Sequence, residues 1–145
     1  MIALIQRVNH ASVSITGSEY SRIGKGLLLL LGLEKHDTLA DGQRLLSKVL
    51  DYRVFADAEG KMNLSLRAID GELLLVSQFT LAGSTDKGLR PSFSSAMAPG
   101  PARELYDQLV NWLQQAHSAT KTGQFAADMQ VSLENDGPVT FLLSS

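Results

Sequence analysis

The sequence contains no cysteine and only three histidines in 145 residues. Without cysteine, the chain can form no disulfide, supply no thiol nucleophile and build no thiolate metal site. The histidines, His10, His36 and His117, do not stand at the spacing of metal ligands, and no carboxylate pair stands in a metal motif. We therefore expect neither a bound metal nor another cofactor.

Long apolar runs and a strong positive charge are also absent. The longest leucine run, Leu27 to Leu31, is far too short to span a bilayer, and the first residues lack the pattern of a signal peptide. These features favour a cytoplasmic protein. The formal net charge is −2, whereas proteins that grip phosphates along their whole surface are usually basic. Any contact with nucleic acid should therefore be local.

The composition and the apolar pattern predict one α+β domain over residues 1–145, with largely antiparallel sheets. One helix should begin at Asp37 or Thr38 and end near Asp51, and a second should begin at Gly100-Pro101. Asp70-Gly71 is a hairpin signal. Strands are predicted at residues 2–8, 11–15, 27–31, 54–55, 64–66, 73–79, 124–125, 129–133 and 139–143.

Two segments are more polar or more turn-like than a compact core requires. Ser77-Gln78-Phe79-Thr80 places three hydrogen-bonding side chains at the end of an apolar strand, a position that suits a functional site. A plain polar strand terminus is an equally good interpretation. Asn135-Asp136-Gly137-Pro138 is a turn, yet glycine lets main chain approach a ligand and proline fixes it there. Between them, residues 82–100 form a long loop.

Four segments occur in the order typical of one known family. They are Ser77-Gln78-Phe79-Thr80-Leu81, Gly88-Leu89-Arg90-Pro91-Ser92-Phe93, Phe125-Ala126-Ala127-Asp128-Met129-Gln130-Val131 and residues 135–141. With residues 1–8 and 52–63, they resemble the bacterial D-aminoacyl-tRNA deacylase family along essentially the whole chain. Residues 34–43 and 102–121 match mainly in pattern, so no functional role is carried over to them.

The resemblance implies a homodimer of barrel-like domains, with each active site at the subunit interface. Ser77, Gln78, Phe79 and Thr80 would form the catalytic floor that receives the 3′-terminal aminoacyl-adenosine. Gly137 and Pro138, joined by a cis peptide bond, would reach into the pocket of the partner subunit. The remaining candidates are Arg7, which would brace this motif, Phe125 and Met129, which would lie near the pocket, and Lys87 and Arg90, which would meet tRNA phosphates unless they are merely solvated loop charges.

The family activity implies selection by shape. If main-chain carbonyls hold the α-amino group, they also fill the space that an L side chain needs, whereas a D side chain points out of the pocket. Glycine has no side chain to reject, so glycyl-tRNA should also be a substrate. No base is evident beside Thr80 or Ser77. We therefore favour catalysis by positioning, with backbone N–H groups near residues 79–80 stabilising the oxyanion and the ribose 2′-hydroxyl assisting.

Three other functions compete with this hypothesis. The chain could be a non-catalytic RNA-end-binding dimer, in which Gly137-Pro138 is only an interface turn. It could use Thr80 as the nucleophile of an esterase. It could also hydrolyse free D-amino-acid esters or peptides. The first and the third leave the four ordered motifs unexplained, and the second lacks an evident base beside Thr80.

Overall fold

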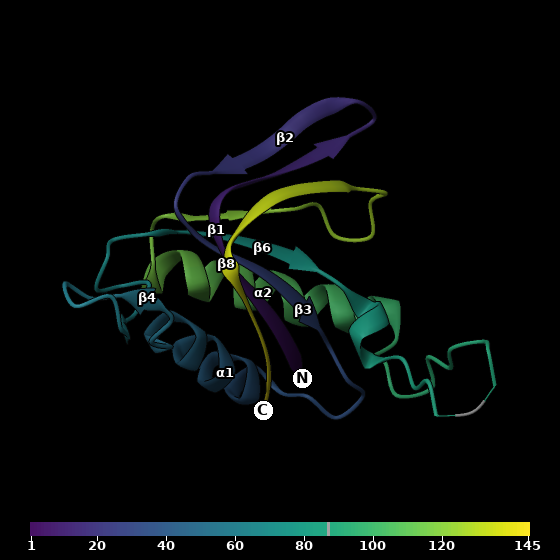
Figure 1. Cartoon of the computed structure of the whole chain (residues 1–145). Helices are drawn as coiled ribbons and strands as arrows, with labels where there is room; N and C mark the ends of the chain where they lie inside the picture. Colours follow the sequence, from purple (N-terminus) through teal and green to yellow (C-terminus); the bar gives the residue numbers. More distant parts are fainter. Residues whose placement is uncertain (87) are drawn as a thin grey trace.

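The computed structural model describes residues 1–86 and 88–145. One long strand, β1 (Ile2–Ile15), pairs with three others (Figure 1). Its first half pairs with β3 (Gly26–Gly32), its second half pairs with β2 (Ser18–Ile23), and β8 (Gln130–Ser144) runs antiparallel along both halves. The strands predicted at residues 2–8 and 11–15 are therefore one strand, because the polar residues between them stay paired with β8.

The hairpin predicted at Asp70-Gly71 is wrong. These residues do turn the chain, and Asp70 has a positive φ of 53°, but the following strand β6 (Glu72–Ser77) pairs in parallel with β3 and with β7 (Thr120–Thr122). The short strand before the turn, β5 (Met62–Leu64), pairs instead with β4 (Phe55–Ala56). The parallel pairing of β6 with β3 places the ends of these two strands side by side, and residues from both ends line the candidate site described below.

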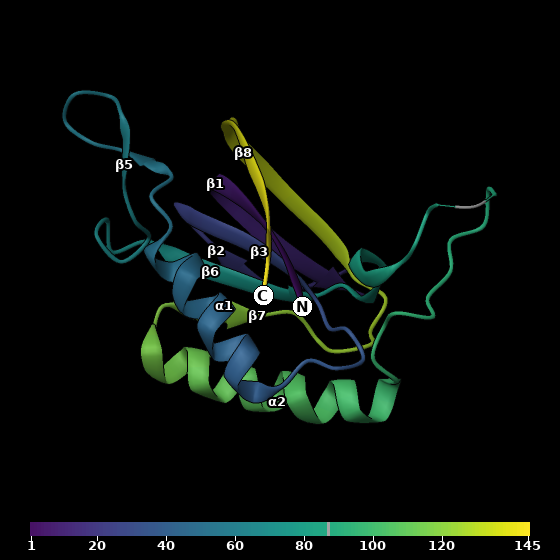
Figure 2. The same ribbon diagram turned by 90° about the horizontal axis from the view of Figure 1, so that it is seen from below.

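Two helices, α1 (Leu39–Asp51) and α2 (Pro99–Ala116), cover one face of the sheet (Figure 2). Thr38 caps α1, since its hydroxyl accepts a hydrogen bond from the backbone N–H of Asp41 while the Asp41 side chain accepts one from the backbone N–H of Thr38. Proline stands in the first turn of α2, where a missing N–H costs no hydrogen bond. No helix in the described part of the chain is long and apolar enough to cross a membrane.

The leucine run in β3 contributes to two cores, as its apolar residues on both faces predict. Leu27, Leu29 and Leu31 pack under the helices, whereas Leu28 packs on the opposite side against the curled second half of β1. Because β1 bends, β2 and the first part of β8 fold over this second core. The predicted α+β domain with a barrel-like, largely antiparallel sheet and two main helices is thus confirmed.

Candidate functional site

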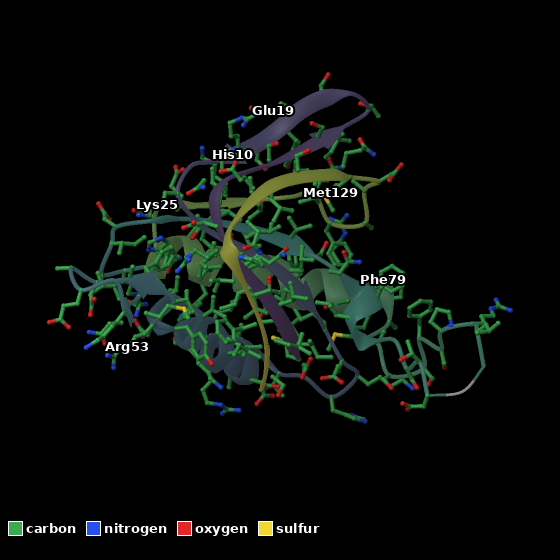
Figure 3. All side chains as sticks on the ribbon, in the orientation of Figure 1. His10, Glu19, Lys25, Arg53, Phe79 and Met129 are labelled. Carbon is green, nitrogen blue, oxygen red and sulfur yellow. The ribbon has the colours of Figure 1, made fainter. Side chains whose placement is uncertain are left out.

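A cavity of about 650 Å³ opens where β6 ends. The described residues that line it are mostly apolar and come from the ends of β3 and β6, the long loop, the first turns of α2 and the segment before β8: Leu31, Leu33, Val76, Ser77, Gln78, Phe79, Phe93, Ala96, Met97, Ala98, Pro99, Ala102, Tyr106, Phe125, Ala126, Ala127, Asp128, Met129 and Val131. Figure 3 shows Phe79 beside the long loop and Met129 on the segment that leads into β8. An apolar cavity with a few polar groups is typical of a small-ligand site.

The floor of the cavity is formed by the first three residues of the motif at residues 77–80. Ser77 is the last residue of β6, and the backbone N–H of Gln78 donates to the carbonyl of Leu31 at 2.8 Å, which joins the floor to β3. A short 3₁₀ helix, η1 (Phe79–Ala82), then turns the chain. The Phe79 side chain is 60% exposed and meets the ring of Phe93 edge-on at 5.1 Å. Ser77, Gln78 and Phe79 line the cavity, whereas Thr80 does not.

Thr80 has no basic partner among the described residues. Its hydroxyl accepts a hydrogen bond from the side-chain amide of Gln78. No histidine is among the described residues that line the cavity; His10 lies near Glu134, and His117 contacts the Gly71 carbonyl. The backbone N–H groups of Phe79 and Thr80 begin η1, where helix geometry gives them no internal acceptor, and Gln78 supplies no side-chain cap. The floor can therefore donate hydrogen bonds but lacks an adjacent base.

Phe125 and Met129 also line the cavity, and Phe125 stands on a tight turn, so the strand predicted at residues 124–125 is wrong. Ala126 has a positive φ of 61°, a conformation that the sequence does not predict for an alanine. The turn is anchored where the backbone N–H of Gly123 donates to the Leu75 carbonyl at 2.9 Å. A side chain at Gly123 would meet the sulfur of Met129 at 2.7 Å, so glycine permits this close packing.

Tyr106 is a cavity residue that sequence reasoning missed. It belongs to the buried apolar face of α2 and is only 3% exposed. In the sequence, such a residue is typical of ordinary core packing. Its ring lies 5.4 Å from that of Phe125, and its hydroxyl donates to the Leu75 carbonyl at 3.4 Å. Burial raises the pKa of the Tyr106 phenol, so it stays neutral. The guanidinium of Arg103, one turn earlier, lies over the Phe125 ring, 5.2 Å from its centroid.

Gly137 and Pro138 lie in an excursion within β8. Gln6 pairs with Thr140 and Val8 with Asn135, so residues 136–139 bulge out opposite Arg7. The sequence predicts two strands separated by a turn here, whereas the structure has one strand interrupted by this bulge. The Gly137-Pro138 peptide bond is cis. Both residues are exposed, and neither lines the cavity of its own chain.

Arg7 and Asn135 hold the excursion in place. The Arg7 Nε donates to the Asp136 carbonyl at 2.9 Å and lies 3.3 Å from the Asp136 carboxylate, while Nη1 donates to the Val54 carbonyl at 2.6 Å. The Asn135 side chain closes the loop, since its Oδ1 accepts from the backbone N–H of Val139 at 2.7 Å. Arg7 therefore connects the excursion to the start of the β4–β5 hairpin.

Of the two predicted loop cations, only Arg90 lies within the described residues, and it is not part of the cavity lining. Arg90 is exposed on the loop at residues 83–98, beyond the cavity lining, and Lys87 lies outside the described residues. In the same loop, Ser84 and Ser92 exchange backbone hydrogen bonds of 2.8 and 2.9 Å, which closes its outer part into a ladder-like turn. The next part of the loop, from Phe93 to Pro99, supplies one wall of the cavity.

A family model described as D-Tyr-tRNA(Tyr) deacylase matches residues 4–144. A protein of Saccharophagus degradans named D-aminoacyl-tRNA deacylase is 58% identical over 144 residues, 99% of each chain. A protein of Escherichia coli O1:K1 / APEC with the same name is 57% identical over 143 residues, again 99% of each chain.

Two solved structures share the fold over nearly their whole length. The c-Myc DNA unwinding element binding protein superposes with a TM-score of 0.96 at 40% identity, covering 100% of this chain and 99% of the other. A probable eukaryotic D-amino acid tRNA deacylase gives a TM-score of 0.88 at 15% identity, covering 99% and 98%. At that identity, the second likeness concerns the fold alone.

Proposed function

This chain belongs to the D-Tyr-tRNA(Tyr) deacylase family, and we propose that it is an editing hydrolase of the cytoplasm that cleaves the ester bond of D-aminoacyl-tRNA. Water adds across the ester, so the products are a free D-amino acid and a tRNA with a free 3′-terminal hydroxyl. The observation that carries the proposal is the cavity of about 650 Å³ at the end of β6. It is the size of a small-molecule site, which suits the aminoacyl-adenosine end of a tRNA.

We further propose that the working form is a homodimer with shared sites. Among the described residues, β8 pairs only with β1 and leaves its other edge open, and Phe141 and Leu142 on it are exposed. A long open edge with apolar side chains invites pairing with another chain. A second copy related by two-fold symmetry would cover it and bring the Gly137-Pro138 excursion of one subunit to the cavity of the other.

In this arrangement the excursion is the source of stereospecificity. Its exposed main-chain carbonyls would accept hydrogen bonds from the α-amino group of the substrate and occupy the volume that an L side chain requires. A D side chain would project toward the cavity mouth, so its identity would matter little. Glycyl-tRNA would be accepted, because a second hydrogen at the α-carbon gives the excursion nothing to reject.

Catalysis would come from position rather than from a protein nucleophile. The N–H groups of Phe79 and Thr80 would stabilise the negative charge on the ester oxygen during attack by water. The neighbouring ribose 2′-hydroxyl of the tRNA would assist the water. The lack of a base beside Thr80 in the described residues supports this route over nucleophilic attack by its hydroxyl.

The activity itself is tested with three substrates: D-tyrosyl-tRNA, L-tyrosyl-tRNA and glycyl-tRNA. We expect release of D-tyrosine and glycine at rates at least 100-fold above that of L-tyrosine, measured as loss of acid-precipitable radiolabel. Protection of all three esters would instead identify an RNA-end-binding protein. Rapid hydrolysis of D-tyrosine ethyl ester without tRNA would identify a general esterase.

The catalytic route is tested with Thr80→Ala and with a tRNA that ends in 2′-deoxyadenosine. We expect Thr80→Ala to retain turnover within about tenfold, since a positioning residue loses far less than a nucleophile. The deoxy substrate should react at least 100-fold more slowly. A Thr80→Ala enzyme that binds normally but no longer turns over would refute the route, as would undiminished hydrolysis of the deoxy substrate.

A further inference from the structure

Asp128 is the only charged side chain among the described residues that line the cavity. All its neighbours in the lining are apolar or neutral, including Ser77, Gln78 and Tyr106. The aspartate is exposed, so its carboxylate stands at the rim rather than in the apolar depth. A lone carboxylate at the mouth of an apolar cavity gives that mouth a negative potential, which favours a cationic group of the ligand.

The Asp128 carboxylate has no protein partner within residues 1–86 and 88–145: it takes part in no side-chain hydrogen bond and in no ion pair. Several other acids are engaged, such as Asp136 with Arg7 at 3.3 Å and Asp51 with Arg67 at 2.9 Å, whereas the other acids without a partner do not line the cavity. The guanidinium of Arg103 is directed to Phe125, over its ring and toward its carbonyl at 3.5 Å. Asp128 is therefore available to a ligand.

The turn that leads to Asp128 is firmly held. Asp128 directly follows a turn over residues 124–127, which is closed by a hydrogen bond of 3.2 Å from the backbone N–H of Ala127 to the Gln124 carbonyl. Within this turn Ala126 has a φ of 61°, which is uncommon for a residue with a side chain. Phe125 contacts both the Tyr106 ring and the Arg103 guanidinium. These contacts fix the start of β8 against the cavity, so the carboxylate is placed before the ligand arrives.

We infer that Asp128 binds the α-ammonium group of the aminoacyl moiety at the cavity rim. The inference rests on the proposed function, because an aminoacyl ester is the substrate that brings a cation next to the reacting carbonyl. An ammonium has three N–H donors, so the carboxylate and the main-chain carbonyls of the excursion can share it. The phosphates of the tRNA are repelled by the same carboxylate, which favours binding with the aminoacyl end at Asp128.

The test compares Asp128→Asn with the wild type on D-phenylalanyl-tRNA and on D-phenyllactyl-tRNA, in which a hydroxyl replaces the ammonium. On the aminoacyl substrate we expect kcat/KM to fall about tenfold, mainly through KM, because a charge-assisted hydrogen bond becomes a neutral one. On the hydroxyacyl substrate we expect a change of less than twofold. Asp128→Glu, which keeps the carboxylate, should retain most of the activity on D-phenylalanyl-tRNA.

Asp107→Asn is the matched control, because Asp107 is exposed on α2, does not line the cavity and loses the same charge. Removing one negative charge alone should strengthen RNA binding slightly, so the control should not lose kcat/KM on either substrate. Equal losses by Asp128→Asn on both substrates, or no loss on either, would overturn the inference. Wild-type protein inactive on D-phenylalanyl-tRNA would refute the proposed function instead.

Discussion

The cavity floor and the Gly137-Pro138 excursion are built by opposite means. The floor continues a buried strand, and the Gln78 backbone is bonded to β3, so the hydrophobic core fixes its position. The excursion is exposed and is held by hydrogen bonds from the side chains of Arg7 and Asn135. The floor is therefore supported by many small contacts, whereas the excursion depends on a few polar ones. Single substitutions that disturb the support without filling the cavity should therefore affect activity most in the excursion.

The largest effect is expected from Gly137→Ala. Gly137 has a φ of +145°, and an added Cβ would lie 2.7 Å from a methyl group of Val139 and 3.0 Å from its backbone nitrogen. The excursion must rearrange, and a displacement of about 1 Å in a positioning group costs about 100-fold in rate. We expect kcat/KM on D-tyrosyl-tRNA to fall at least 100-fold, while size-exclusion chromatography still gives a folded protein.

A mixed dimer determines whether this loss acts across subunits. We would pair a Gly137→Ala subunit with a Ser77→Phe subunit, whose new ring fills the floor of its own cavity. Each variant homodimer should be inactive. If the excursion serves the partner's cavity, the mixed dimer has one intact site and recovers about half of the wild-type activity. An inactive mixed dimer would show that the floor and the excursion of one site belong to the same subunit. The excursion would then not serve the partner's cavity.

An intermediate effect is expected from Arg7→Lys. The guanidinium reaches the carbonyls of Val54 and Asp136 together, and a lysine ammonium cannot reproduce this planar fork. The excursion would keep its backbone conformation but gain freedom. We expect kcat/KM on D-tyrosyl-tRNA to fall about tenfold and the ratio of D to L hydrolysis to fall with it. An unchanged D to L ratio would show that the orientation of the excursion does not set stereospecificity.

The same contrast explains what the sequence could reveal. The floor could be predicted because it ends a strand whose apolar run and terminal polar residues are local features, and both helices were predicted from their caps and periodicity. The excursion reads as a simple break between two strands, because pairing of β8 along the whole of β1 is a long-range property. No local sequence pattern marks Asp128 or Tyr106 as a cavity residue. The turn with a positive φ at Ala126 places Asp128 at the cavity, and the direction of α2 places Tyr106 there.

The smallest effect on activity is expected from Tyr106→Phe, which alters the support of the floor. The lost hydrogen bond is long, 3.4 Å, and the Leu75 carbonyl that accepts it also accepts from the Gly123 N–H at 2.9 Å. No buried carbonyl is left without a partner, so the free energy of unfolding should fall by no more than about 1 kcal/mol. The phenylalanine ring keeps its contact with Phe125, and we expect kcat/KM to fall less than threefold. Urea denaturation and single-turnover kinetics measure the two quantities separately. A loss of activity as large as that of Arg7→Lys would mean that the floor, too, depends on a single polar contact.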